Sequence, residues 1–352
     1  MNHKPQISPV LPVLTAFLSL ATLLLSVFSL ANPGFADESK AQAADEKKAD
    51  PAESAKPDPN LPAADEILNQ ARTKLEGLES LKCDLHQTAL IAGMKLQATG
   101  SYAEAAGDKV RLELSIFALT PMKVADGKSP ALDAPAPELK EADNRGTLLQ
   151  VCDGTVVHTS WKNGDKQTLF RRNLRDIQAS VAGVEKYDAQ SVAMDLGVGG
   201  LRGLIARLQK NMLFVPVKME KNGDRDTYEV TGRWNDRVRK EIFQLPEGTV
   251  VDSRPFVPEY VRIYVDKESM LIRRIQFWKR SIDQTQKMAR PLLTLDLRNL
   301  KLNEQVDPEM FSFTPPENAA EEDQTEAIIQ AIKQGLNPTP AGQPPVGQPP
   351  AK

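Results

Sequence analysis

The stretch "DKVRLELSIF" (residues 108–117) alternates polar and apolar side chains, and its apolar positions include Leu112, Leu114 and Ile116. Successive side chains of a β-strand point to opposite faces of a sheet, so this pattern predicts a half-buried strand. The apolar side must be covered, whereas the polar side can face water. We therefore expect these three side chains to lie on the inner, concave face of a sheet.

Further strands are predicted on both sides of this one along the chain. A hairpin is predicted where Asp153-Gly154, a dipeptide typical of two-residue turns, joins "GTLLQVC" to "TVVHTSW". Residues 290–302 repeat the alternation with Leu293, Leu295 and Leu297, which we also place on the inner face. The other segments with strand character are residues 82–90, 94–104, 212–220, 226–234, 259–267 and 270–280.

Two segments have helical rather than strand periodicity. Residues 62–79 repeat apolar side chains at helical spacing, and residues 196–212 do the same with Leu201, Leu204, Ile205 and Leu208. One helix, a run of strands, a helical insertion and more strands predict an α+β fold with a long curved antiparallel sheet. Glycines at the start of the second helix lower its stability, so a movable lid and a fixed plug both remain open.

The strand-rich region closes with "VDPEMFSFTPP" (residues 306–316). The chain is expected to turn at Asp307-Pro308, and Phe311 and Phe313 follow two residues apart. We expect the two phenylalanines to close the last strand against the core. As packing residues, they need no ligand to explain them.

The two ends of the chain differ in composition from its middle. Lys4 and an apolar run from about Val10 to Ala31 predict a signal peptide, residues 1–36, cleaved after Ala36; a retained membrane anchor is the alternative. We expect a disordered charged linker over residues 37–60, the folded domain over 61–320, a C-terminal helix over 321–335 and a disordered Pro/Gly/Gln tail over 336–352.

The sequence has few residues in patterns typical of catalysis, metal binding or nucleic-acid binding. The formal net charge is −3 and no basic stripe with interleaved aromatics occurs, which argues against nucleic acid. His86 and His158 lack partners at metal-ligand spacing, and "GVGGLRG" does not fit a phosphate-binding loop. We therefore expect no cofactor, no metal and no enzymatic activity. Cys83 and Cys152 are either a disulfide or two separate buried thiols.

The order of the first helix, "SLKCDLHQT", "CDGTVVHTSW", the helical insertion and "VDPEMFSFTPP" resembles the periplasmic outer-membrane lipoprotein carriers, the LolA-like family, over about residues 62–320. The resemblance implies an incomplete β-barrel whose concave face holds acyl chains, with helices as lid or plug. It also implies a periplasmic or secreted carrier with membrane-protein donor and acceptor partners. The candidate ligand-binding residues are Leu112, Leu114, Ile116, Leu201, Leu204, Ile205, Leu208, Leu293, Leu295 and Leu297.

One segment departs from the pattern of that family. In the carriers, a basic residue before a proline at the start of the third strand helps to latch the lid, but this chain has Ala105-Ala106-Gly107-Asp108 there. A relative that keeps the fold and changes the cargo is therefore an alternative. Three functions remain open: a carrier of lipid or lipoprotein, an envelope stress sensor or regulatory binding protein of the same fold, and a structural envelope protein without ligand.

Overall fold

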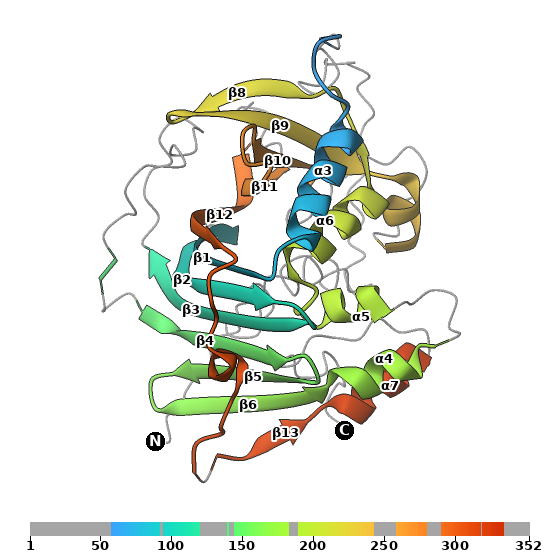
Figure 1. The fold of residues 1–352 in the computed structure, drawn as a ribbon. Helices are drawn as coiled ribbons and strands as arrows, with labels where there is room; N and C mark the ends of the chain where they lie inside the picture. The colour runs from blue at the N-terminus through green and yellow to red at the C-terminus, as the bar shows by residue number, and fades with distance from the viewer. Residues whose placement is uncertain are drawn as a thin grey trace, which may run out of the picture.

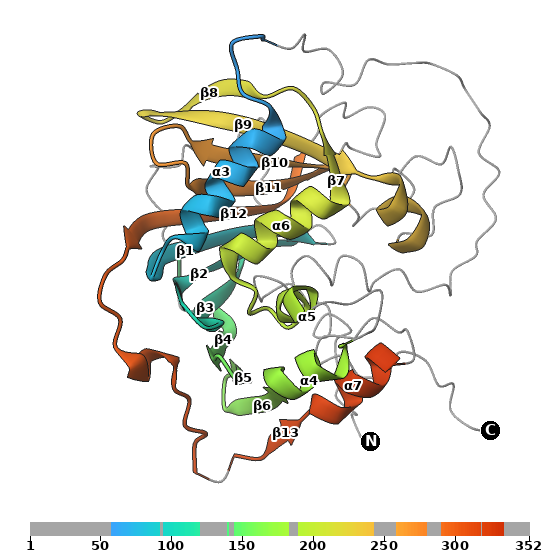
Figure 2. The ribbon, with the colours of Figure 1, turned by 45° about the vertical axis from the view of Figure 1, so that its right-hand side comes forward.

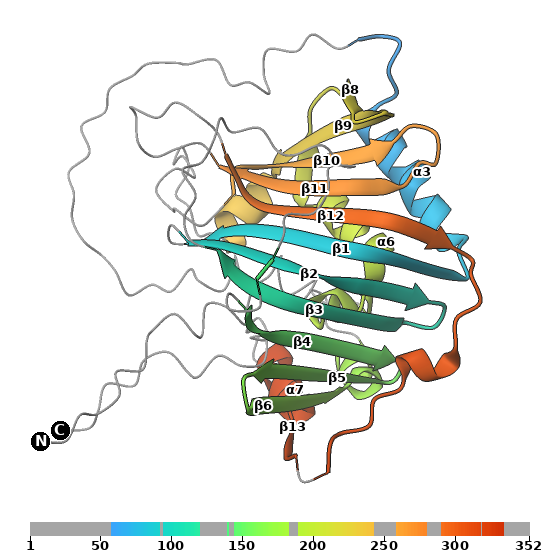
Figure 3. The same ribbon diagram turned by 90° about the vertical axis from the view of Figure 1, so that its left-hand side faces the viewer.

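The computed structural model describes residues 58–91, 94–119, 139–140, 144–182, 189–242, 258–279, 290–317 and 319–333. Within these residues, thirteen strands form one sheet in the order β13-β6-β5-β4-β3-β2-β1-β12-β11-β10-β9-β7, with β8 also paired to β9 (Figure 3). The strands are β1 Ser80–Ile91, β2 Met94–Ala105, β3 Lys109–Leu119, β4 Asn144–Asp153, β5 Val156–Asn163, β6 Lys166–Asn173, β7 Met212–Phe214, β8 Lys218–Asn222, β9 Arg225–Trp234, β10 Tyr260–Asp266, β11 Ile272–Lys279, β12 Arg290–Leu302 and β13 Glu321–Asp323.

The sheet is long, curved and open, because β7 and β13 end its two sides without pairing to each other. Neighbouring strands are antiparallel except for the parallel pair β13 and β6. The first strand, β1, lies between β2 and β12, so the beginning and the end of the strand-rich region meet in the middle of the sheet. The predicted α+β fold with a long curved sheet that forms an incomplete barrel is confirmed.

The strand register produces one apolar face. Residues directly opposite each other on neighbouring strands share a face. A row of such residues crosses four strands: Val230 of β9, Ile263 of β10, Ile275 of β11 and Leu295 of β12. On the other half of the sheet, Leu114 lies opposite Leu148 of β4. All these side chains are buried and belong to one core, so the inner face of the sheet is the main apolar surface of the domain.

Among the described residues, five α-helices lie over this inner face, and Figures 1 and 2 show how they cover it. They are α3 Ala64–Glu76, α4 Leu174–Ser180, α5 Ala189–Asp195, α6 Gly200–Asn211 and α7 Thr325–Lys333. The apolar side of each helix is buried in the same core as the inner face of the sheet. The helix predicted over residues 62–79 is α3, and the stripe predicted within 196–212 lies on α6.

Proline breaks one of the predicted strands. Residues 212–220, expected as one strand, form β7 and β8 with Pro216 between them, and both pieces pair with β9. Proline has no backbone N–H to donate to the strand ladder, which explains the interruption.

The prediction for the closing phrase holds in part, because the turn at Asp307-Pro308 is present and Phe311 is buried, whereas Phe313 is only half-buried. Residues Pro308–Phe311 form a 3₁₀ helix, η4, which packs against β3 and β4, and Phe311 is buried there rather than on a last strand. Phe313 instead lies with its ring centroid 5.0 Å from that of His158. Pro308 at the start of η4 and the Asp307 side chain, which accepts from the Glu309 N–H, favour this local turn over a strand.

The chain beyond the closing phrase returns to the sheet. Glu321–Asp323 form β13 beside β6, and α7 follows within the segment that was predicted to be helical from residue 321. The predicted signal peptide, nearly all of the charged linker and the C-terminal tail lie outside the described residues. In the part of the chain that is described, no helix combines the length and the apolar content needed to cross a membrane.

Both cysteines are free and buried in the core, so they are two separate thiols. Burial raises the pKa of Cys83, and burial raises the pKa of Cys152 to about 12. The thiolate is the reactive form of cysteine. We predict that a polar maleimide leaves both cysteines unmodified in the native protein and labels both after unfolding, as measured by mass spectrometry. Rapid labelling of either thiol in native buffer would contradict this placement.

Candidate functional site: the helix-covered inner face of the sheet

The structure brings the ten candidate ligand-binding residues into one apolar core. Each is at most 4% exposed. The residues from β3 and β12 lie on the sheet, and those from α6 pack as part of the same core. They are Leu112, Leu114, Ile116, Leu201, Leu204, Ile205, Leu208, Leu293, Leu295 and Leu297. Their position on the inner face makes them candidates for contact with cargo, and in this structure protein side chains fill the space around them.

None of the ten candidates lines either of two cavities that described residues form. One, of about 130 Å³, lies where the end of α3, the β2–β3 turn and the start of α6 meet. The other is an open groove of about 870 Å³ between α3 and the β10–β11 turn. The inner face beneath α6 is thus separate from both of these spaces.

A carboxylate from the sheet holds the start of α6. Glu104, on β2, accepts hydrogen bonds from the Leu201 N–H at 3.0 Å and from the Tyr102 hydroxyl at 2.6 Å. Gly200 permits this approach, because its φ is +67° and a Cβ there would lie 2.5 Å from the Glu104 Oε2. Burial raises the pKa of Glu104, and the two hydrogen bonds and Arg202 oppose that shift only in part. The carboxyl group thus satisfies an N–H of the first turn of the helix.

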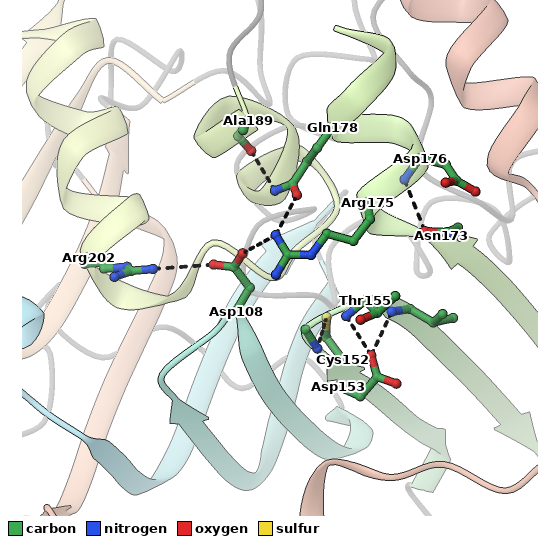
Figure 4. A network of polar contacts seen from close by, with 12 residues as sticks. Asp108, Cys152, Asp153, Thr155, Asn173, Arg175, Asp176, Gln178, Ala189 and Arg202 are labelled. Atoms are coloured by element: carbon green, nitrogen blue, oxygen red, sulfur yellow. Dashed lines mark hydrogen bonds and ion pairs between the residues drawn. The ribbon is translucent and has the colours of Figure 1, made fainter. Parts of the chain in front are cut away.

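The turn that follows β2 adds a second contact (Figure 4). Asp108 lies 3.4 Å from the Arg202 guanidinium of α6 and 3.7 Å from that of Arg175 on α4. Both arginine side chains are about half exposed, so each ion pair contributes little to stability. Their effect is to fix orientation, because one carboxylate joins two helices to the β2–β3 turn.

The carriers that the sequence resembles have a cation at the start of the third strand. This chain has the anion Asp108 there, and the cations Arg175 and Arg202 lie on the helices. The available signal was an acidic turn residue, Arg202 in the helix predicted over residues 196–212, and a second arginine, Arg175. Nothing in their spacing along the chain indicates that the three meet.

Several other contacts hold α6. Its residue Arg207 pairs with Asp195 of α5, and Gln209 donates to Asn69 of α3 at 3.1 Å. The apolar stripe of α6 is buried along its length. These contacts favour a fixed plug over a freely moving lid for α6.

The histidines lie away from the inner face. His86 follows the inner residue Leu85 on β1 and therefore points to the opposite face, where burial lowers its pKa. His158 Nδ1 lies 2.7 Å from a Glu321 carboxylate oxygen and so joins β5 to β13. Among the described residues, no three or more His, Cys, Asp or Glu side chains gather in a way that could hold a metal ion.

Comparisons with known proteins find only remotely similar solved structures. No family model and no curated protein matches the chain. Similar solved structures include a putative outer membrane lipoprotein-sorting protein domain from Vibrio parahaemolyticus, with 12% identity, coverage of 71% of this chain and 97% of that one, and a TM-score of 0.27. LprF from Mycobacterium bovis has 13% identity, coverage of 76% and 100%, and a TM-score of 0.35.

A LolA superfamily protein from Nitrosomonas europaea is also similar, with 11% identity, coverage of 72% of this chain and 99% of that one, and a TM-score of 0.24. The family to which the sequence shows a resemblance is thus present among the similar solved structures. Because the TM-scores are low, the description of the fold rests on the strand order and helix placement of this chain itself.

The hydrogen bonds of Glu104 generate a prediction about stability. Glu104→Ala leaves the Leu201 N–H and the Tyr102 hydroxyl without their acceptor, and an unsatisfied buried polar group costs about 1 to 3 kcal/mol. We expect the unfolding free energy to fall by about 2 kcal/mol or more. Glu104→Gln keeps an acceptor and should cost much less. Urea denaturation measures both variants, with the exposed Glu113→Gln as the matched control.

The sign of the pH dependence follows from the raised pKa of Glu104. The folded state holds the proton more tightly than the unfolded state, so this residue contributes stability at low pH that is lost as pH rises through the folded pKa. The Glu104→Gln variant should lack this part of the pH profile. An unchanged profile in the variant would contradict the assignment.

Proposed function

We propose that this protein is an exported carrier that binds the acyl chains of a lipid or lipoprotein on the inner face of its open sheet. One observation carries the proposal: the apolar face of a long sheet is covered by five short helices rather than by a second sheet. Short helices can undock without breaking the strand ladder. An undocked helix would expose a continuous apolar trough.

The energetics of such a site require no catalytic group. Burying hydrocarbon contributes about 0.8 kcal/mol per methylene, so ten buried methylenes contribute about 8 kcal/mol. That amount is enough to compete with a helix whose apolar side occupies the same surface. The cargo would then select the open conformation in proportion to its greater affinity for it.

The cellular location in this proposal comes from the N-terminal sequence. A cleaved signal peptide would release a periplasmic or secreted shuttle, whereas a retained N-terminal anchor would suit an envelope stress sensor or regulatory binding protein. A structural envelope protein would bind no acyl chain at all. Mass measurement of the mature N-terminus distinguishes the shuttle from an anchored protein, and a binding assay distinguishes both from a structural protein.

Binding of an acylated peptide tests the proposal directly. We expect the full-length protein to bind an N-palmitoylated peptide in calorimetry and to ignore the same peptide without its acyl chain. Hydrogen exchange should show faster exchange in at least one covering helix on binding, while the central strands β1–β3 stay protected. No binding, or binding without any change in the helices, would overturn the proposal.

Loosening the cover should favour binding of apolar molecules. Leu204→Ala removes a buried side chain of α6 and should lower the unfolding free energy by about 2 to 5 kcal/mol. We expect the variant to bind N-phenyl-1-naphthylamine more strongly than the parent, as measured by fluorescence. Leu213→Ala is the matched control, because Leu213 of β7 is 62% exposed and its loss should change stability by less than about 0.5 kcal/mol.

Equal probe binding by the parent protein and by Leu204→Ala would mean that a less stable α6 gives the probe no more access to the inner face. That result would contradict the idea that this helix competes with apolar ligands for the sheet.

A further inference from the structure

Arg172 is a buried cation on the inner side of the sheet. It lies on β6 directly opposite Val157 of β5, and Val157 belongs to the core, so the two side chains share the inner face. Arg172 is 7% exposed. Its neighbour Arg171 points to the other face, is 44% exposed at its side chain and lies 3.7 Å from Asp323.

The partners of Arg172 are neutral and its hydrogen bonds are long. Its Nε donates to the Gln324 side-chain oxygen at 3.2 Å, and its Nη1 donates to the Thr159 hydroxyl at 3.4 Å. The Glu322 carboxylate acts to raise the pKa of Arg172. Its Oε1 accepts a hydrogen bond of 3.0 Å from the side-chain nitrogen of Gln324. Within the described residues, no carboxylate forms an ion pair with this guanidinium.

In a second buried arginine, Arg274, a carboxylate compensates the positive charge. Arg274 is 2% exposed, and two of its nitrogens donate to the two carboxylate oxygens of Asp296. A charge removed from water is costly unless it is paired in this way. Arg172 has no such pair in the described part of the chain, and burial lowers its pKa to about 10. Its environment is therefore incomplete for a cation.

The segment that connects β13 to α7 covers Arg172. Gln324 lies between β13 and α7, and the Thr325 hydroxyl accepts from the Asn173 N–H at 2.8 Å. On α7, Ile328, Ile329 and Ile332 are buried in the same core as the inner face. The buried guanidinium of Arg172 and an apolar interior thus meet beneath β13 and α7.

We propose that Arg172 binds the anionic headgroup, a carboxylate or a phosphate, of a single-chain lipid whose acyl chain lies on the inner face of the sheet. This inference rests on the proposed function. The planar guanidinium matches either headgroup with two parallel hydrogen bonds, which a neutral amide such as Gln324 does not supply. The headgroup replaces Gln324, and β13 with α7 moves to admit it.

The test compares ligands that differ only in charge. Full-length protein is titrated with palmitate, 1-palmitoyl-lysophosphatidic acid and uncharged 1-palmitoylglycerol, each below its critical micelle concentration. We expect the two anions to bind at least about tenfold more tightly than the glyceride, since a hydrogen bond to a charged group is among the stronger polar contacts. Acetate and inorganic phosphate show whether a headgroup without a chain suffices, and we expect neither to compete at equal concentration.

Substitutions assign the preference to one side chain. Arg172→Met should remove the preference for anions and leave affinity for the glyceride unchanged, whereas Arg171→Met, on the other face, should change neither. Arg172→Lys keeps the charge and should retain part of the preference. Gln324→Ala leaves Arg172 in place without its Nε partner and should strengthen anion binding, which tests the proposal even if Arg172→Met fails to fold.

The outcomes separate this inference from the function on which it rests. Binding of all three lipids with equal affinity, or an anion preference that survives Arg172→Met, would overturn the role of Arg172 and leave the acyl-chain site standing. Binding of none of them would overturn both. Competition by acetate or phosphate alone would show a small-anion site rather than a lipid headgroup site.

Discussion

The apolar inner face of the thirteen-stranded sheet must be kept from water, and the rest of the domain is arranged around that requirement. An open sheet cannot cover itself by closing, so α3, α4, α5, α6 and α7 supply the cover from one side. Polar residues then fix the helices in place: Glu104 holds the start of α6, and Asp108 joins α6 to α4. The site proposed for cargo and the core that stabilises the fold are therefore the same surface.

The ten candidate residues lie between the helices and the sheet and line neither the open groove beside α3 nor the smaller cavity at the start of α6. An exposed apolar trough would be unstable in water, and the helices that dock on it remove that cost. Polar contacts hold both ends of the cover. Glu104 and Asn69 contact α6, and residues Glu321, Gln324 and Thr325 join the β13–α7 segment to β5 and β6.

Local patterns in the sequence predicted much of this architecture. Alternation placed Leu112, Leu114 and Leu295 in strands, and helical spacing found α3 and α6, because both periodicities report which side of an element is buried. The turn at Asp307-Pro308 was predictable from its residues, but the partners of the two phenylalanines were not, because Phe311 packs against β3 and β4 and Phe313 against His158. Contacts between residues far apart in the sequence left no local pattern. Examples are Glu104 with Leu201, Asp108 with Arg175, and Arg172 with Gln324, which meet only once the strands and helices have packed.

The most direct measurement of the central claim is photo-crosslinking with a palmitate analogue that carries a diazirine near the middle of its chain, followed by peptide mapping. The account predicts crosslinks to inner-face residues of β3 and β12, such as Leu114 and Leu295, and to the apolar side of α6 or α7, with excess palmitate abolishing them. Crosslinks confined to exposed positions such as Leu213 and Met219, or labelling that palmitate does not suppress, would contradict it.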